Sequence, residues 1–76
     1  MDRFIDLMKL ELNKIRKTHG DIHSLHEGLG VLFEEFDEFK AEVWKKEQNR
    51  SKEHLREELV QIAAVALRIA TDCDLL

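Results

Sequence analysis

The sequence predicts an all-α fold: a three-helix subunit with a long antiparallel helical hairpin, assembling into a helical-bundle homo-oligomer. Composition is the first reason, because the 76 residues include no proline and only three glycines, while helix-favouring Ala, Leu, Glu and Lys are common. The second is periodicity, since apolar residues recur at three- and four-residue steps in three segments. The third is size, because a chain this short buries only about 60% of its unfolded surface and needs additional stabilisation by association.

The first helix is predicted over residues 1–17. Asp2 lies near its start, and Arg16 and Lys17 lie near its end, which complements the helix dipole. Gly20 follows and tolerates the left-handed conformation in which many helices end. The apolar side of this helix consists of Phe4, Ile5, Met8, Leu12 and Ile15.

The second helix is predicted to begin after Ser24 and to end near Lys46. The stretch from Ser24 to Glu27 fits a capping box, in which the serine hydroxyl accepts a first-turn N–H and the glutamate reaches back. Phe33 and Trp44 lie toward the far edge of its apolar arc, where a second subunit is expected to cover them. The main seam of this helix has heptad-like spacing and consists of Leu25, Leu29, Leu32, Phe36, Phe39 and Val43.

The third helix follows a polar turn over residues 47–51, with Asn49 or Ser51 as its N-cap. Its seam repeats the spacing of the second helix and consists of Leu55, Leu59, Ile62, Ala66, Ile69 and Cys73. Two long seams joined by a short turn predict an antiparallel hairpin in which the seams face each other, with the first helix packed alongside.

Charge and cysteine content exclude several classes of function. The chain has 12 Lys and Arg against 16 Asp and Glu, and no basic cluster of the kind that binds nucleic-acid backbones. No apolar run approaches the roughly 20 residues of a membrane span, and no signal-peptide pattern is present. Cys73 is the single cysteine, so no internal disulfide can form. We therefore expect one cytoplasmic domain over residues 1–76 that binds neither nucleic acid nor membrane.

An acidic stripe runs beside the seam of the second helix. Glu35, Glu38 and Glu42 lie within about 60° of one another around the helix axis. Given a turn near residue 49, Glu35 and Glu38 should face the level of Glu58 and Gln61 on the third helix. Carboxylates that converge beside a buried seam are costly without a cation, and Mg²⁺ prefers oxygen ligands of this kind. The alternative reading of the stripe is a solvated acidic surface.

Three motifs resemble one known family. Glu34, Glu35 and Glu38 form an E-E-x-x-E motif, the next predicted helix carries "EELVQ" in an Ala-rich context, and "HG" at residues 19–20 precedes the run "HEGLGVLFEE". Together they resemble the MazG-like family of all-α nucleoside triphosphate pyrophosphohydrolases, and the resemblance extends from about His19 to Asp72.

The resemblance implies a hydrolase that converts a nucleoside triphosphate to the monophosphate and pyrophosphate, acting as a homodimer or homotetramer. It implies Mg²⁺, or Mn²⁺ in its place, as the cofactor. Arg68 and Lys52 would be candidates to bind the remaining phosphate oxygens. The implied catalytic residues are Glu34, Glu35, Glu38 and Glu58, and the implied metal ligands are Glu35, Glu38, Glu58 and Gln61.

Gln61 departs from the family pattern. The second motif of the family is usually E-x-x-D, whereas Glu58 is followed here by Leu59, Val60 and Gln61. A neutral amide oxygen then stands where an anionic ligand is expected. The enzyme hypothesis therefore has an alternative, a catalytically inactive MazG-like module that binds nucleotide or metal or serves in oligomerisation. A third hypothesis is an unrelated helical-hairpin oligomerisation domain with an acidic surface.

Two residues near the end of the third helix have a simpler interpretation. Arg68 and Asp72 are one turn apart, so they are expected to form a surface ion pair with each other.

Overall fold

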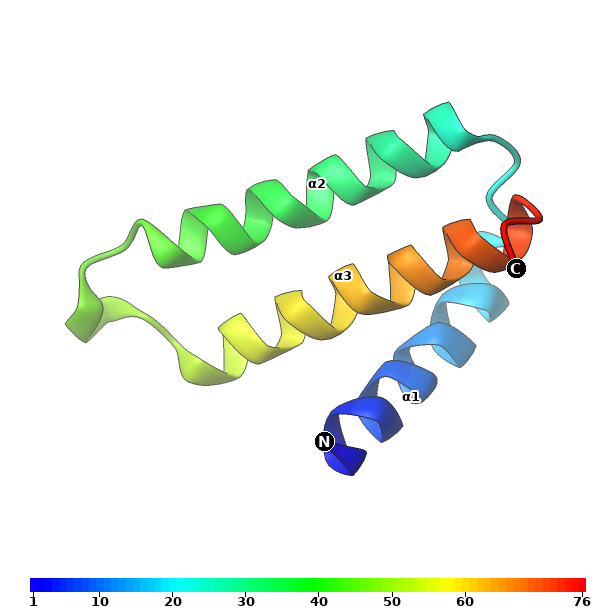
Figure 1. The fold of residues 1–76 in the computed structure, drawn as a ribbon. Helices are drawn as coiled ribbons and strands as arrows, with labels where there is room; N and C mark the ends of the chain where they lie inside the picture. Colours follow the sequence, from blue (N-terminus) through cyan, green and yellow to red (C-terminus); the bar gives the residue numbers. More distant parts are fainter.

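The computed structural model describes residues 1–76 and consists of three α-helices without a β-strand (Figure 1). The helices are α1 (Asp2–His19), α2 (Leu25–Val43) and α3 (Lys52–Asp72), and a short 3₁₀ helix, η1 (Glu47–Asn49), connects the last two. The predicted all-α class is thus confirmed. None of the helices combines the length and the apolar character that crossing a bilayer requires.

The helix starts follow from their capping residues. The hydroxyl of Ser24 accepts the N–H of Glu27 at 3.0 Å, and the hydroxyl of Ser51 accepts the N–H of His54 at 3.0 Å. Both serines therefore satisfy a donor that the first turn of a helix leaves free. Helix α2 ends at Val43, earlier than the predicted end near Lys46, because the chain turns there into η1.

Helix α3 is the centre of the fold, because both α1 and α2 pack against it. Gly28 of α2 lies against the side chain of Ile69, where a Cβ on Gly28 would be only 2.7 Å from the Cγ1 atom of Ile69. This glycine allows the close approach of α2 to α3. The buried apolar core is small and consists of Ile22, Val60, Ala64 and Val65.

The predicted seam forms only part of the interface between α2 and α3, where Ile69 contacts α2 at Gly28. Leu29 and Phe36 of α2, and Leu59 of α3, are largely exposed. The buried side chains of α3 belong instead to the neighbouring stripe and to the side facing α1: Glu58, Val60, Ala64, Val65 and Arg68. The two helices are therefore rotated so that their polar stripes face inward, and much of the apolar seam remains on the surface.

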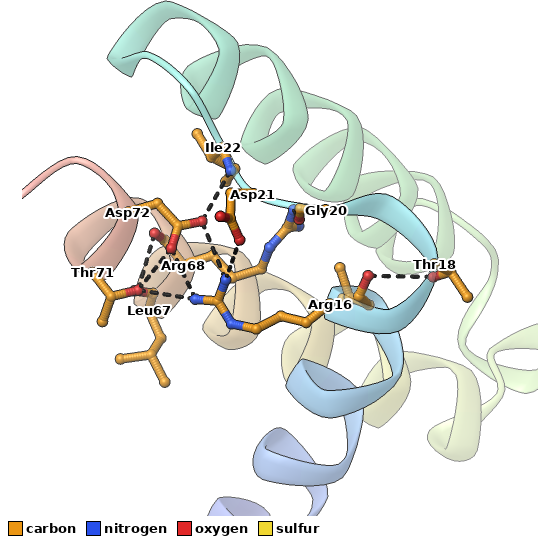
Figure 2. Close-up of polar contacts among 10 residues, drawn as sticks. Arg16, Thr18, Gly20, Asp21, Ile22, Leu67, Arg68, Thr71 and Asp72 are labelled. Atoms are coloured by element: carbon orange, nitrogen blue, oxygen red, sulfur yellow. Dashed lines mark hydrogen bonds and ion pairs between the residues drawn. The ribbon is translucent and has the colours of Figure 1, made fainter.

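Arg16 ties the end of α1 to the end of α3 (Figure 2). Its guanidinium donates to Asp72 at 2.9 Å and to Asp21 at 2.9 Å, and Asp72 also accepts the N–H of Ile22 at 2.9 Å. The hydrogen bond from Arg16, followed by that from Ile22, lowers the pKa of Asp72. The predicted pair of Arg68 with Asp72 is wrong: Arg68 is buried and donates to the carbonyl of Gly20 at 3.1 Å.

Candidate metal centre

Three glutamates from two helices meet on one side of the α2–α3 pair. Glu35 and Glu38 are one turn apart on α2, and Glu58 faces them from α3. One carboxylate oxygen from each residue lies within 4.8 Å of the others. The register expected from a turn near residue 49 places these three residues at a similar level, and the structure brings them together.

Burial and mutual repulsion make this group unusually basic. Burial raises the pKa of Glu58 to about 7 from an ordinary value of 4.5, and a hydrogen bond with Glu38 and the charges of Glu38 and Glu35 add to the rise. Burial also raises the pKa of Glu35, followed by the charge of Glu38. Without a cation, the group therefore retains a proton close to neutral pH.

Two oxygens of the group lack a hydrogen-bond donor. The Oε2 atoms of Glu35 and of Glu58 are buried and have no partner within the chain. A buried polar atom without a partner is costly, and a carboxylate oxygen is more so. A cation would bind these oxygens and would also remove the repulsion among the three carboxylates.

The donor set suits a hard divalent cation. Mg²⁺ binds carboxylate oxygens at about 2.0–2.1 Å, prefers six ligands and retains several waters. Opposite ligands of such an ion are about 4.2 Å apart, a separation close to the 4.8 Å within which the three oxygens lie. Soft-metal ligands are absent from the group, because neither cysteine nor histidine belongs to it.

Two cavities flank the carboxylates. The larger, of about 460 Å³, lies between α1, α2 and α3, and its polar lining includes Lys14, His19, Glu34, Glu35, Gln61 and Arg68. The other, of about 410 Å³, is lined by Glu38, Ala41, Glu42, Lys45, His54 and Glu58. Cavities of this volume are within the range that holds small-molecule ligands.

Of the four remaining predicted residues, Glu34, Gln61 and Arg68 line the larger cavity and Lys52 does not. Glu34 is exposed and lines it beside Glu35, and the charge of Glu34 contributes to the raised pKa of Glu35. Gln61 is half-buried, follows Glu58 by one turn and lines the same cavity. Arg68 also lines it, with an Nε atom that is buried and has no partner. Lys52 is exposed at the first residue of α3 and lines neither cavity.

Glu42 has a role that the sequence did not reveal. It is buried and accepts three hydrogen bonds. The donors are the backbone N–H of Ser51 at 2.9 Å, the ammonium of Lys45 at 3.0 Å and the Nδ1 atom of His54 at 3.0 Å. The bond from Ser51, followed by that from Lys45, lowers its pKa to about 2. Glu42 thus fastens the end of α2 to the start of α3. The only signal in the sequence was its distance of one turn from Glu38, which placed it in the acidic stripe.

Comparisons of the chain with protein-family models, with curated proteins and with solved structures found no match.

Proposed function

We propose that the chain is a Mg²⁺-dependent nucleoside triphosphate pyrophosphohydrolase of the MazG-like type, with Mn²⁺ as an alternative ion. The observation that carries the proposal is the meeting of Glu35, Glu38 and Glu58, with two buried oxygens that no donor satisfies. A metal ion bound there would neutralise phosphate charge, the chemistry that phosphoanhydride hydrolysis requires.

The proposed reaction assigns a role to each residue of the site. Glu35, Glu38 and Glu58 hold the ion, and the amide oxygen of Gln61 is a further, neutral ligand. Glu34 orients a water molecule and accepts its proton as the oxygen attacks the α-phosphorus. The bond between the α-phosphorus and the bridging oxygen breaks, and pyrophosphate leaves with that oxygen. The balanced products are the nucleoside monophosphate and pyrophosphate.

Two cations of the larger cavity support a phosphate-bearing substrate. Arg68 is buried at the cavity wall with a free Nε donor, and Lys14 reaches the same cavity from α1. A guanidinium and an ammonium beside a metal ion can bind the oxygens of a phosphate chain. Glu35 lines the same cavity. One phosphate-bearing ligand could therefore contact a metal ion at Glu35 and the two cations at the same time.

The proposal includes the assembly and the location of the protein. The antiparallel α2–α3 hairpin would be the building block of a helical-bundle homo-oligomer, a homodimer or a homotetramer. Support comes from the small core, in which only four apolar residues are buried. A single cysteine supports a cytoplasmic location, where thiols stay reduced.

Pyrophosphate release tests the activity. We expect wild-type protein with Mg²⁺ to release pyrophosphate from at least one member of a panel of nucleoside triphosphates, and Glu38→Gln to lower the rate by at least about 100-fold. The matched control is Glu57→Gln, which changes an exposed carboxylate beside Glu58. Equal release by wild type and Glu38→Gln would contradict the proposal.

Gln61 favours the second candidate, a non-catalytic module that binds metal or nucleotide. A neutral ligand in place of a carboxylate removes one negative charge from the site and weakens its hold on Mg²⁺. If this candidate is right, Mg²⁺ raises the melting temperature of the wild type but no triphosphate is cleaved. Gln61→Asp should then tighten Mg²⁺ binding by about tenfold, measured by calorimetric titration. A gain of pyrophosphate release by the same variant would further support this candidate.

A further inference from the structure

A row of large apolar side chains is exposed along α2. Leu25, Leu29, Phe33 and Phe36 are 55%, 52%, 59% and 51% exposed, respectively. Their spacing of four, four and three residues places them on one side of the helix. Leu29, Phe33 and Phe36, with Leu32, form a groove of about 360 Å³ that is lined only by apolar residues. We call this row, together with Leu59 and Ala66 of α3, the apolar face.

Leu59 and Ala66 lie on the same side of the helix pair as this row. Around α2, Leu29 and Phe36 are about 100–120° from Glu35, which faces α3. Around α3, Leu59 and Ala66 are about 100–120° from Val65, on the side opposite to Gln61 and Arg68. Since Glu35, Gln61 and Arg68 line one cavity, the polar stripes share one side of the α2–α3 pair, and the apolar residues share the other.

The exposed area of the chain is larger than a folded monomer of this mass requires. The surface is 5795 Å², whereas a folded protein of 9.0 kDa is expected to expose about 4,900 Å². The excess of roughly 900 Å² is close to the area of about 800 Å² that each partner buries in a stable interface of standard size. An apolar face of this kind is rare on a monomer.

Residue size makes the apolar face complementary to itself. Phe33 and Phe36 give the α2 part large side chains, whereas Ala63, Ala66 and Ala70 give the neighbouring part of α3 small ones. In a two-fold dimer, α2 of one copy can lie over α3 of the other, so that large side chains face small ones in both halves. The result is a four-helix core, the usual way for two helix pairs to cover each other.

We infer that the apolar face binds the apolar face of a second copy of this chain and forms a two-fold homodimer. The interface identifies the surface that the proposed assembly would use, but it does not depend on metal binding or on catalysis. It also leaves Glu35, Glu38 and Glu58 accessible, because the carboxylates lie on the other side of the α2–α3 pair.

The mass of the full chain in solution tests the inference. We expect light scattering to give twice the 9.0 kDa of one chain, and Phe36→Glu to raise the dissociation constant by at least about 100-fold, so that monomer is observed. Phe36→Leu should retain the dimer. The control is Leu10→Glu, because Leu10 is 66% exposed on α1 and outside the apolar face; the mass of this variant should equal that of the wild type.

Concentration provides a second measurement on the unmodified chain, which decides the case if Phe36→Glu does not fold. The melting temperature of a dimer rises with protein concentration, whereas that of a monomer does not. A wild type that is monomeric at every concentration, with a constant melting temperature, overturns the inference. The apolar face would then be covered by a different protein. A dimer whose mass survives both Phe33→Glu and Phe36→Glu overturns it as well. A dimer that shows no response to Mg²⁺ supports the interface and counts only against the proposed enzyme.

Discussion

Glu42 and Glu58 are two buried glutamates on the same helix pair, yet their acidities differ widely. Glu42 is 3% exposed and Glu58 is 7% exposed. The pKa of Glu42 is lowered to about 2, first by the hydrogen bond from Ser51. The pKa of Glu58 is raised to about 7, first by burial. Burial penalises both carboxylates, so the difference comes from what each one contacts.

The contacts separate a structural carboxylate from one that is available to a ligand. Glu42 receives a backbone N–H, an ammonium and an imidazole from its own chain. Glu58 faces Glu35 and Glu38, and its Oε2 atom has no donor. A buried acid that the fold leaves unsatisfied is a candidate for a functional site, whereas a satisfied one belongs to the architecture.

The largest expected effect is the response of stability to Mg²⁺. At a concentration of 100 times its dissociation constant, the ion should stabilise the wild type by about 2.7 kcal/mol, or about 10–20 °C in melting temperature for a small domain. Glu58→Gln should lose most of this rise because it removes a ligand. Glu42→Gln should retain the rise, although its melting temperature without the ion should fall.

Thermal melts with and without Mg²⁺ provide the measurement, and Ca²⁺ and Na⁺ serve as controls for ion type and ionic strength. If Glu58→Gln and Glu42→Gln both respond to Mg²⁺ as the wild type does, the ion binds elsewhere and the distinction between the two glutamates is wrong.

A second effect concerns stability near neutral pH in the absence of metal. Because the pKa of Glu58 is about 7 in the folded chain against an ordinary value of 4.5, the folded state binds more protons in this interval. The contribution of Glu58 to the free energy of unfolding is complete below pH 4.5 and is lost as the pH rises through 7. The loss is on the order of 2 kcal/mol. Glu58→Gln should reduce this loss, as should saturating Mg²⁺.

Urea unfolding at a series of pH values measures the effect. Glu57→Gln is the matched control, because its carboxylate is exposed and outside the group. A wild type whose stability is constant between pH 4.5 and 7 would mean that Glu58 ionises normally.

The smallest expected effect lies on the acid side. The pKa of Glu42 is lowered from 4.5 to about 2, so its contribution is complete above pH 4.5 and is lost as the pH falls through 2. Glu42→Gln should make the acid-side decline shallower. Part of the decline should persist, because Asp72 also has a lowered pKa. If Glu42→Gln and the wild type lose stability in parallel from pH 4.5 downward, the assigned difference between the two glutamates is wrong.

Local features of the fold could be read from the sequence. Ser24 caps α2 as predicted, and Ser51 is the one of the two predicted candidates, Asn49 and Ser51, that caps α3. The capping signal could be read because it depends on neighbouring residues alone. The level at which Glu35 and Glu38 meet Glu58 could also be predicted, because it follows from the position of the turn and the rise per residue.

The rotation of the helices could not be predicted. Periodicity identifies which residues share a side of a helix, but not which neighbour covers that side. Leu29 and Leu59 were therefore assigned to the contact between α2 and α3, whereas the polar stripe with Val65 and Arg68 faces inward. The functions of Glu42 and Arg68 were missed for a related reason, since their partners are backbone groups of Ser51 and Gly20.

The tie between Arg16 and Asp72 has a consequence for the order in which the chain can fold during translation. Helix α1 leaves the ribosome before α3, the helix on which it packs, and Asp72 stands in the final turn of α3. The apolar stripe of α1 therefore lacks its permanent neighbour until α3 has been synthesised. The wall of the cavity that α1 provides can close only after that point.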